Sequence, residues 1–397
     1  MGKLNVFTIT LNNPQGVYSP GQCLQGHLTL ELNEDMKMRG IQLQLHGGAR
    51  VKWSESCPKG VGKARRTVTK HYVAKDTYFN NELVLFGKAT GGDGDTPTLP
   101  AGRYTYPFQY QLPPNLPSSF EGTVGRVRYW LKGTILKPWK FDDTTKRAFT
   151  VVNLLDLNAE PEAMQGLRGE VQETLCCLCC TSGPISCRFQ IDRCGFVPGE
   201  SIPIKAEIIN RSNRKMKRSF AELYMVVTYH APKKSRTNTK KLGEISHGEI
   251  LPGESDIWTG DLLPIPPVPP SKLNGCSIIV IDYYVKFCVE PAGPALKLEI
   301  PLKVLIGSIP LKSTLEQIGS SPQIQGSDQD HLFQEGAQAD APPIEGMPQP
   351  SYAECTFGTV TIQDDYENEH TQGDTNYTPM YTYYNWGNMT QPSAPPQ

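Results

Sequence analysis

Apolar and polar residues alternate along most of residues 1–312, which is typical of β-strands with one buried and one solvent-facing side. Turn-forming residues separate the alternating stretches, and no segment has a strong helical period. The pattern predicts an all-β protein made of β-sandwiches. The inward positions of the four clearest stretches are Leu24, Gly26, Leu28, Leu30 and Leu32; Tyr104, Tyr106, Phe108, Tyr110 and Leu112; Ile202, Ile204, Ala206 and Ile208; and Leu296, Leu298, Ile300, Leu302 and Val304.

The strand pattern contains an internal repeat. The turn Pro20-Gly21 precedes one alternating strand, and the turn Pro198-Gly199 precedes another. Further along each half, a proline pair leads to a strand with an aromatic pair, Tyr129-Trp130 in the first half and Tyr283-Tyr284 in the second. A repeat of this length predicts two similar β-domains in series. We place them at residues 1–152 and 183–308, with a linker at 153–182.

The last part of the chain, residues 309–397, has a different character. Ser, Gln, Asp, Gly and Pro dominate it, and the alternation stops. No lysine or arginine follows Lys312, and residues 313–397 contain 12 acidic residues, whereas residues 1–312 carry 39 basic and 28 acidic residues. Low hydrophobicity with charge of one sign cannot offset the entropy of ordering, so this tail is expected to be disordered and acidic.

The composition favours a cytoplasmic protein. The N-terminus lacks the apolar run of a signal peptide, and no apolar run is long enough to span a bilayer. Eleven cysteines is an odd number, and four of them fall within five positions. A secreted disulfide scaffold would space them more evenly, so we expect reduced thiols in a cytosolic environment.

Catalytic signatures are missing from the sequence. The seven histidines form no H-E-x-x-H motif, and neither a G-x-S-x-G turn nor a phosphate-binding glycine loop ahead of a helix is found. We therefore expect no enzymatic activity, cofactor or resident metal ion.

Four stretches resemble the arrestin-domain-containing proteins, the α-arrestin branch of the arrestin superfamily. They are PSSFEGTVGRVRYWLKGTI at 117–135, TLCCLCCTSGPIS at 174–186, GFVPGESIPIKAEI at 195–208 and IPLKVLIGSIPL at 300–311. The resemblance covers residues 1–312 continuously. It implies two tandem immunoglobulin-like, arrestin-type β-sandwiches, in agreement with the repeat found independently.

Members of that family carry two Pro-Pro-x-Tyr motifs in the tail, which bind WW domains of HECT-type ubiquitin ligases. The matching positions here are Gln349-Pro350-Ser351-Tyr352 and Thr378-Pro379-Met380-Tyr381, so the first proline of each motif is missing. The remaining prolines favour the extended conformation that a WW groove binds, and the tyrosine fills a second pocket. Pro350, Tyr352, Pro379 and Tyr381 are therefore the candidate ligase-binding residues.

The resemblance implies a bridging role. The sandwiches would bind a membrane receptor or transporter as cargo, and the tail would bring the ligase, so that cargo is ubiquitinated, endocytosed and sorted in endosomes. Such a protein would be cytoplasmic and recruited to the plasma membrane and endosomes.

The cysteine cluster Cys176, Cys177, Cys179 and Cys180 has three interpretations. These thiols are structural, they are sites of reversible palmitoylation in a segment able to approach a membrane, or they bind metal or undergo redox chemistry. A second C-x-x-C pair at separate spacing, which a zinc site would need, is missing from the sequence.

Basic clusters are candidate contacts for phosphorylated receptor tails or anionic lipid, because Lys and Arg pair with phosphate oxygens. Aromatic residues do not alternate with them, so nucleic acid is not expected as a partner. The alternative is that they are solvated hairpin tips. The candidate residues are Arg65, Arg66, Lys70, Lys215, Lys217, Arg218, Lys233 and Lys234.

Three other interpretations remain open. A redox-linked regulator of the thioredoxin-interacting type would use a cysteine in the second sandwich, but residues 195–275 contain none. A coat or retrieval subunit of arrestin fold would generally lack the tyrosine motifs. The opposite charges of tail and body would also allow the tail to fold back and mask the body.

Overall fold

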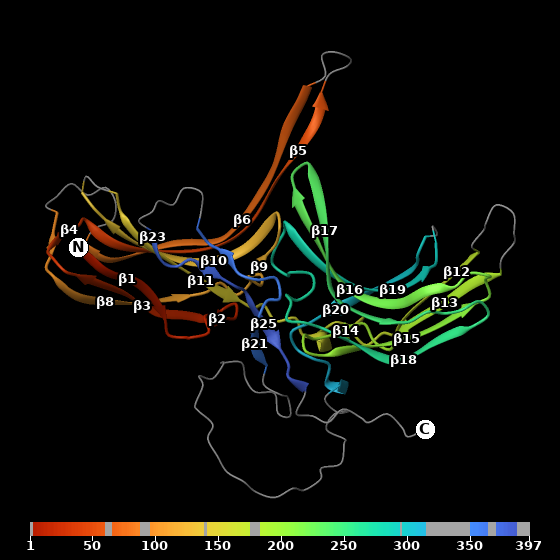
Figure 1. The fold of residues 1–397 in the computed structure, drawn as a ribbon. Coiled ribbons are helices and arrows are strands. Elements are labelled where there is room, and N and C mark those ends of the chain that lie inside the picture. Colours follow the sequence, from red (N-terminus) through yellow and green to blue (C-terminus); the bar gives the residue numbers. More distant parts are fainter. Residues whose placement is uncertain are drawn as a thin grey trace, which may run out of the picture.

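Two β-sandwiches lie one after the other in the computed structural model, and strands from the C-terminal tail run along the junction between them (Figure 1). The structure describes residues 3–59, 66–87, 96–138, 141–174, 183–293, 296–314, 350–363 and 371–386. The fold class predicted from the alternating pattern, two β-sandwiches in series, is confirmed.

The N-terminal sandwich packs a sheet of order β1-β3-β8 against a sheet in which β2, β11, β10, β5 and β6 are neighbours, with β9 pairing on β10. β5 and β6 form a long hairpin that projects from the molecule (Figure 1). The strands are β1 (Leu4–Leu11), β2 (Val17–Tyr18), β3 (Cys23–Leu32), β4 (Met36–Lys37), β5 (Gly40–Lys59), β6 (Arg66–Gly87), β7 (Thr98–Leu99), β8 (Gly102–Gln111), β9 (Phe120–Glu121), β10 (Gly125–Leu136) and β11 (Asp143–Val151).

The C-terminal sandwich packs a sheet of order β12-β13-β15-β18 against one of order β14-β20-β19-β16-β17. β12 falls within the expected linker 153–182, yet it pairs antiparallel with β13 as an edge strand of this sandwich. A short 3₁₀ helix (Leu157–Ala159) precedes it. The strands are β12 (Leu167–Thr174), β13 (Pro184–Ile191), β14 (Gly195–Phe196), β15 (Ser201–Asn210), β16 (Met216–Ala231), β17 (Lys234–His247), β18 (Ser255–Pro264), β19 (Ile279–Pro291) and β20 (Leu298–Ile306).

Most of the apolar positions singled out by the alternation face the core. Leu24, Leu28 and Leu30 are fully buried, and so are the isoleucines of β15 at 202, 204 and 208. Leu296 is the exception, because β20 begins at Leu298 and the Leu296 side chain is 90 % exposed. Alternation marks the face of a strand but not the residue at which the strand starts.

The internal repeat is visible in matching hydrogen bonds. The Tyr129 hydroxyl donates to the carbonyl of Pro117 at 2.7 Å, and the Tyr283 hydroxyl donates to the carbonyl of Pro269 at 2.6 Å. In both halves a nearby serine hydroxyl accepts a hydrogen bond at 2.9 Å from the last long strand, Ser119 from Val151 and Ser271 from Ile306. The two sandwiches therefore share the same local arrangement of strands and hydrogen bonds.

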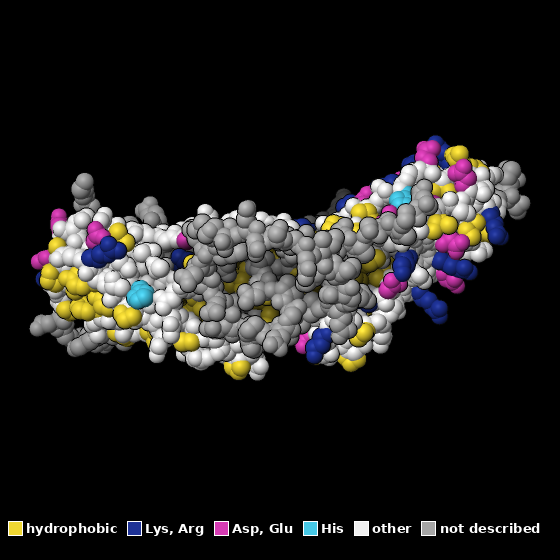
Figure 2. All heavy atoms as spheres, turned by 90° about the horizontal axis from the view of Figure 1, so that it is seen from below, with side chains coloured by type: hydrophobic (Ala, Val, Ile, Leu, Met, Phe, Trp, Pro, Cys, Tyr) yellow, Lys and Arg dark blue, Asp and Glu magenta, His cyan; other side chains and the backbone are white. Residues whose placement is uncertain are grey.

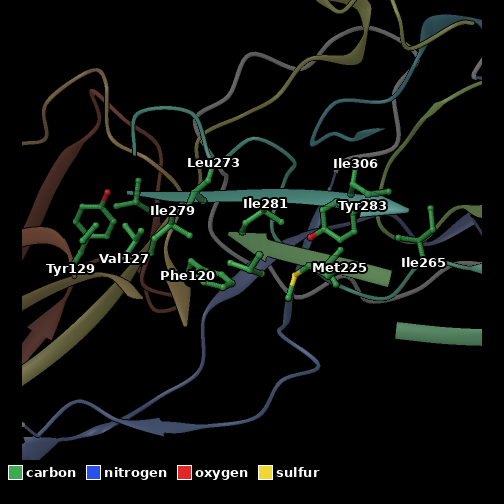
Figure 3. Packing of buried hydrophobic residues seen from close by; sticks show 14 of the residues in the cluster. Phe120, Val127, Tyr129, Met225, Ile265, Leu273, Ile279, Ile281, Tyr283 and Ile306 are labelled. Carbon is green, nitrogen blue, oxygen red and sulfur yellow. The ribbon is translucent and has the colours of Figure 1, made fainter. Parts of the chain in front are cut away.

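One hydrophobic core runs through both sandwiches. Phe120, Val127 and Tyr129 of the N-terminal sandwich lie in the same buried cluster as Ile279 and Tyr283 of the C-terminal sandwich (Figure 3). Tyr229 of β16 packs so closely on Gly122 and Gly125 that a side chain at Gly122 would collide with its hydroxyl and one at Gly125 with its ring. Since this contact is apolar and closely packed, it holds the two sandwiches together.

Over residues 350–363 and 371–386, the tail differs from the disordered segment that its composition predicts. Residues 350–363 and 371–386 form short strands on the body, drawn in blue in Figure 1. The strands are β21 (Ser351–Glu354), β22 (Val360–Thr361), β23 (Thr371–Asp374), β24 (Asn376–Tyr377) and β25 (Met380–Tyr383). β21 pairs with β25, β22 pairs with β24, and β23 adds parallel to the edge of β11.

Candidate functional site: the tail-binding seam

The tail-binding seam is the surface where residues 350–363 and 371–386 meet the two sandwiches. β23 extends the N-terminal sheet, with Thr371 opposite Thr144 and Asp374 opposite Arg147. Gly373 has φ +101°, and a side chain there would collide with the backbone of Lys146. A glycine at this position therefore lets the tail backbone approach β11 closely.

Three tail tyrosines anchor the seam through their hydroxyls. Tyr377 donates to the carbonyl of Phe149 at 3.4 Å, and its hydroxyl also lies 3.2 Å from the Thr150 hydroxyl. Tyr381 donates to the carbonyl of Ser119 at 3.0 Å, and Tyr384 donates to the carbonyl of Ser308 at 2.8 Å. The first two sites belong to the N-terminal sandwich and the third follows the last strand of the C-terminal sandwich. The tail therefore bridges the two sandwiches.

These tyrosines are buried as deeply as core residues. Tyr377, Tyr381 and Tyr384 are 7 %, 1 % and 3 % exposed. Burial raises the pKa of each hydroxyl above its ordinary value of 10, so each stays protonated and remains a donor. A buried tyrosine whose hydroxyl has a partner combines apolar burial with a satisfied polar atom.

A second contact holds the tail through Lys146. This lysine is 1 % exposed, and its ammonium donates to the carbonyl of Ile362 at 2.9 Å. It also lies over the Trp130 ring, 4.8 Å from the ring centre. An ammonium can be buried only when it is well partnered, and the tail supplies part of that environment.

The four ligase-binding candidates all lie in the seam: Tyr352 and Tyr381 belong to the paired strands β21 and β25, and Pro350 and Pro379 directly precede these strands. Tyr352 lies opposite Thr382, and Ala353 lies opposite Tyr381. Pro350 is exposed and Tyr352 is half-buried, whereas Pro379 is buried and its carbonyl accepts a hydrogen bond from the Cys355 amide at 2.9 Å. The two motifs, which are separate in the sequence, are therefore brought side by side.

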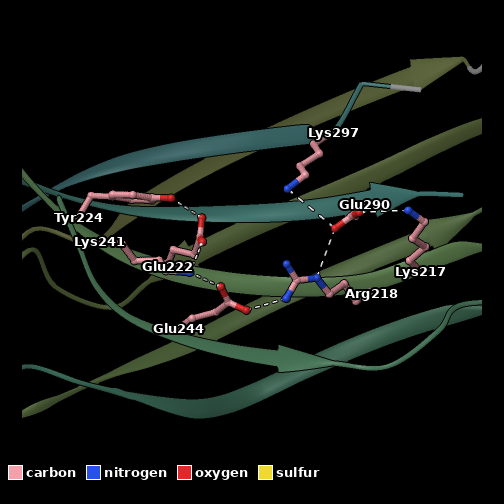
Figure 4. Close-up of polar contacts among 8 residues, drawn as sticks. All are labelled: Lys217, Arg218, Glu222, Tyr224, Lys241, Glu244, Glu290 and Lys297. Carbon is pink, nitrogen blue, oxygen red and sulfur yellow. Dashed lines mark hydrogen bonds and ion pairs between the residues drawn. The ribbon is translucent and has the colours of Figure 1, made fainter. Parts of the chain in front are cut away.

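The basic candidates around residues 215–218 are engaged with carboxylates. Lys217 and Arg218 both contact Glu290, and Arg218 also contacts Glu244 at 2.6 Å (Figure 4). Hydrogen bonds from Lys241 and Arg218 lower the pKa of Glu244 to about 2. Lys215 contacts Glu249 at 2.9 Å. On the face seen in Figure 2, acidic and basic side chains likewise lie close together over the C-terminal sandwich.

The other basic candidates gather on two hairpins that meet. Lys234, at the β16–β17 turn, contacts Glu55 of the β5–β6 hairpin at 2.5 Å. Lys70 lies opposite Glu55 in the β5–β6 ladder. Arg66, Lys70 and Lys233 have exposed side chains, whereas Arg65 lies outside the described residues. Lys215 and Lys217 are exposed as well, so the two basic regions differ in the ion pairs of residues 215–218 with carboxylates and not in exposure.

Known proteins share both sandwiches. The chain matches the arrestin (or S-antigen) N-terminal domain over residues 7–158 and the arrestin (or S-antigen) C-terminal domain over residues 181–311. It is 32 % identical over 353 residues to arrestin domain-containing protein 17 of Caenorhabditis elegans, across 86 % of this chain and 79 % of that protein. This chain belongs to the arrestin family.

Its relatives place it in the α-arrestin branch. It is 34 % identical over 303 residues to arrestin domain-containing protein 4 of Mus musculus, across 75 % of this chain and 70 % of that protein. It is 28 % identical over 307 residues to thioredoxin-interacting protein of Homo sapiens, across 77 % of this chain and 75 % of that protein. Because the arrestin fold is a non-enzymatic adaptor fold, family membership confirms that this α-arrestin is not an enzyme.

The cysteine cluster of this α-arrestin, at 176, 177, 179 and 180, lies outside the described residues. The described strands on either side of it, β12 ending at Thr174 and β13 beginning at Pro184, pair with each other in the C-terminal sandwich. Among the described residues, no group of three or more His, Cys, Asp or Glu side chains could hold a metal ion. Within the same part of the chain, no helix is both long and apolar enough to cross a membrane.

Sequence reasoning did not identify Tyr377, Tyr384, Lys146 or Ile362 as functional residues. A signal for the tyrosines was present, because residues 377–386 contain five aromatic side chains in an otherwise polar tail. Such an aromatic density is atypical of a segment that stays disordered. Lys146 gave no signal, because the tail carbonyl to which it donates belongs to Ile362, 216 residues away in the chain.

Proposed function

We propose that this α-arrestin is an adaptor that links a membrane receptor or transporter to a HECT-type ubiquitin ligase with WW domains. The ligase would ubiquitinate the cargo, which is then endocytosed and sorted in endosomes. The observation that carries the proposal is the pair of x-Pro-x-Tyr motifs, at 349–352 and 378–381, in the tail of a two-sandwich arrestin. The adaptor would act in the cytoplasm and be recruited to the plasma membrane and endosomes.

The chemistry of the motifs supports WW binding. A proline two residues before a tyrosine favours the extended backbone that docks in an aromatic groove. Loss of the first proline of each motif should weaken each site by about 1 kcal/mol, as for a lost peripheral contact. Two motifs on one tail recover affinity against a ligase with several WW domains, because the second binding event is intramolecular.

The distribution of lysines limits where ubiquitin could be attached. No lysine follows Lys312, so the segment that would hold the ligase offers no ubiquitin acceptor on a lysine side chain. The acceptors would lie on the sandwiches or on the cargo. The exposed basic residues Arg66, Lys70 and Lys233 on the meeting hairpins are the proposed contacts for phosphorylated cargo tails or anionic lipid.

A redox role is less well supported by the described cysteines. The thiolate is the reactive form, and a reactive cysteine has a lowered pKa. Burial raises the pKa of Cys187 and Cys288 to about 12, and that of Cys355 to about 11. Burial also raises the pKa of Cys194 and Cys276. These five thiols are therefore poor nucleophiles.

Changing both motif tyrosines tests the proposal. We expect the variant with Tyr352→Ala and Tyr381→Ala to lose recovery of a WW-domain HECT ligase, because each aromatic ring fills a pocket of the groove. The measurement is co-precipitation of the ligase with the full chain from cells. Tyr383→Ala, which changes a neighbouring tyrosine outside both motifs, serves as the control and should recover the ligase normally. Unchanged recovery by the double variant would refute the assignment of the tail.

A further inference from the structure

Tyr381 has two partners that cannot be engaged together. In the proposed function its ring enters a WW pocket, and in the structure the same ring is 1 % exposed in the seam. Its hydroxyl donates to the Ser119 carbonyl at 3.0 Å, beside Phe120 in the core that joins the sandwiches. A WW domain therefore has no access to this side chain while the tail is docked.

The backbone around Tyr381 is also occupied. Residues Met380–Tyr383 form β25 and pair along their whole length with β21, which contains Tyr352 of the first motif. The Cys355 amide donates to the Pro379 carbonyl at 2.9 Å. A WW groove binds its ligand as a polyproline helix with a solvated backbone, so these strand pairs would have to open first.

The docked tail also depends on how the two sandwiches are placed. Tyr381 is held by the N-terminal sandwich, and Tyr384, three residues on, is held by Ser308 beyond the C-terminal sandwich. The Tyr384 amide donates to the Pro198 carbonyl at 3.1 Å, and Gly199 has φ +95° where a side chain would collide with the Tyr384 backbone. A short, extended segment can satisfy both ends only while the sandwiches keep this spacing.

We propose that the seam between the sandwiches is a binding site for the Thr378–Tyr381 motif, and that the body and a WW domain compete for Tyr381. This inference rests on the proposed function, since it assigns a second use to one of the two ligase-binding motifs. The docked chain is the form that does not recruit ligase through this motif. Release of Tyr384 from the C-terminal sandwich frees Tyr381 for the ligase.

Tyr384→Ala tests the competition because it removes an anchor outside both motifs and outside both sandwiches. Binding of a recombinant WW domain from a HECT-type ligase is measured on the full chain by calorimetry. Since an occluded site binds with an affinity reduced by the fraction of free sites, we expect Tyr384→Ala to raise the affinity about ten-fold or more. Adding Tyr381→Ala should abolish this gain, and Tyr383→Ala, half-buried on the same strand, should leave the wild-type affinity unchanged.

Cys355 supplies a readout of docking that does not involve the WW domain. Its side chain is 6 % exposed, and burial raises the pKa of its thiol to about 11, so it should alkylate slowly while the tail is docked. Alkylation of Cys355 in the full chain is followed by mass spectrometry. Tyr384→Ala should accelerate it, and so should addition of the WW domain to the wild-type chain.

The two measurements separate the outcomes. If Tyr384→Ala exposes Cys355 but the WW domain binds both chains equally well, the competition is overturned and the proposed function stands. If Cys355 is exposed and the WW domain binds neither chain, the proposed function fails and the competition fails with it. If Tyr384→Ala changes neither alkylation nor WW affinity, the seam does not hold the motif.

Discussion

His247, the last residue of β17, lies between two carboxylates of β18. Its ring nitrogens are 2.9 Å from Asp256 and 3.2 Å from Asp261, and the ring stacks on Trp258 with centres 3.9 Å apart. Burial lowers the pKa of His247, but the hydrogen bonds to the two aspartates outweigh it and raise the pKa above its ordinary value of 6.5. When it is protonated, His247 can bind both aspartates and so links the edge strands β17 and β18 of the two sheets of the C-terminal sandwich.

This contact gives a pH-dependent prediction. A raised folded-state pKa means that the stabilisation is fully present below the unfolded-state pKa and is lost as the pH rises through the folded-state pKa. We expect His247→Gln to lower the free energy of unfolding by about 1 kcal/mol near pH 5.5, and by much less near pH 8. Denaturant unfolding at both pH values measures it, with His230→Gln, whose ring contacts the Ser235 hydroxyl, as control. An effect independent of pH would refute the role of the charge.

At the level of single residues, the sequence predicted which side chains of a strand face the core, but not which polar residues contact each other. The inward faces of β3 and β15 follow from alternation, because burial of one face requires period two. The partners of Lys146 and Lys217 lie 216 and 73 residues away in the chain, so they could not be read from the sequence. Those of His247 are only 9 and 14 residues away but lie on the other sheet, which the sequence does not show. The basic clusters looked free in the sequence, but much of their charge is paired in the fold.

At the level of elements, a second prediction concerns the hydrogen bond from a tyrosine hydroxyl to a proline carbonyl that occurs in both sandwiches. Tyr129 and Tyr283 are fully buried, and each donates to a proline carbonyl that precedes its strand. Tyr129→Phe and Tyr283→Phe should each cost about 1 kcal/mol of unfolding free energy, because each leaves a buried carbonyl without its donor. Tyr284→Phe, on the half-buried face of the same strand, should change stability by less than about 0.5 kcal/mol. Equal effects of all three substitutions in denaturant unfolding would contradict the role of the tyrosine–proline hydrogen bond.

The repeat itself could be predicted, and the edge strands could not. The Pro-Gly turns and the aromatic pairs recur in the sequence because each sandwich makes the same turns and the same tyrosine–proline hydrogen bond. The repeat therefore predicted two sandwiches directly. β12 falls in the segment between the two copies of the repeat, which was predicted to be a linker, and none of its eight residues is fully buried. The tail strands β21–β25 are only two to four residues long, too short for an alternating pattern to be recognised. They pair with one another and with the edge of β11.

At the level of the whole molecule, the tail is part of the folded structure over the described segments. From the opposite charges of body and tail, folding back of the tail on the body was one of the open interpretations. The contacts that hold it include three tyrosine hydroxyls on backbone carbonyls, one buried lysine and an added strand. Charge can bring an acidic tail towards a basic body, but register and hydrogen bonds decide where it rests. The tail therefore joins both sandwiches instead of trailing from one.

Native-state hydrogen exchange of the full chain tests this claim most directly. The amides of Cys355, Ile362 and Tyr384 donate at 2.9, 2.8 and 3.1 Å to the carbonyls of Pro379, Thr375 and Pro198. A docked tail predicts that these three amides exchange at least about ten-fold more slowly than in an unstructured peptide, and that Tyr384→Ala removes this protection. Exchange of all three in the wild-type chain at the rate of an unstructured peptide would contradict the account.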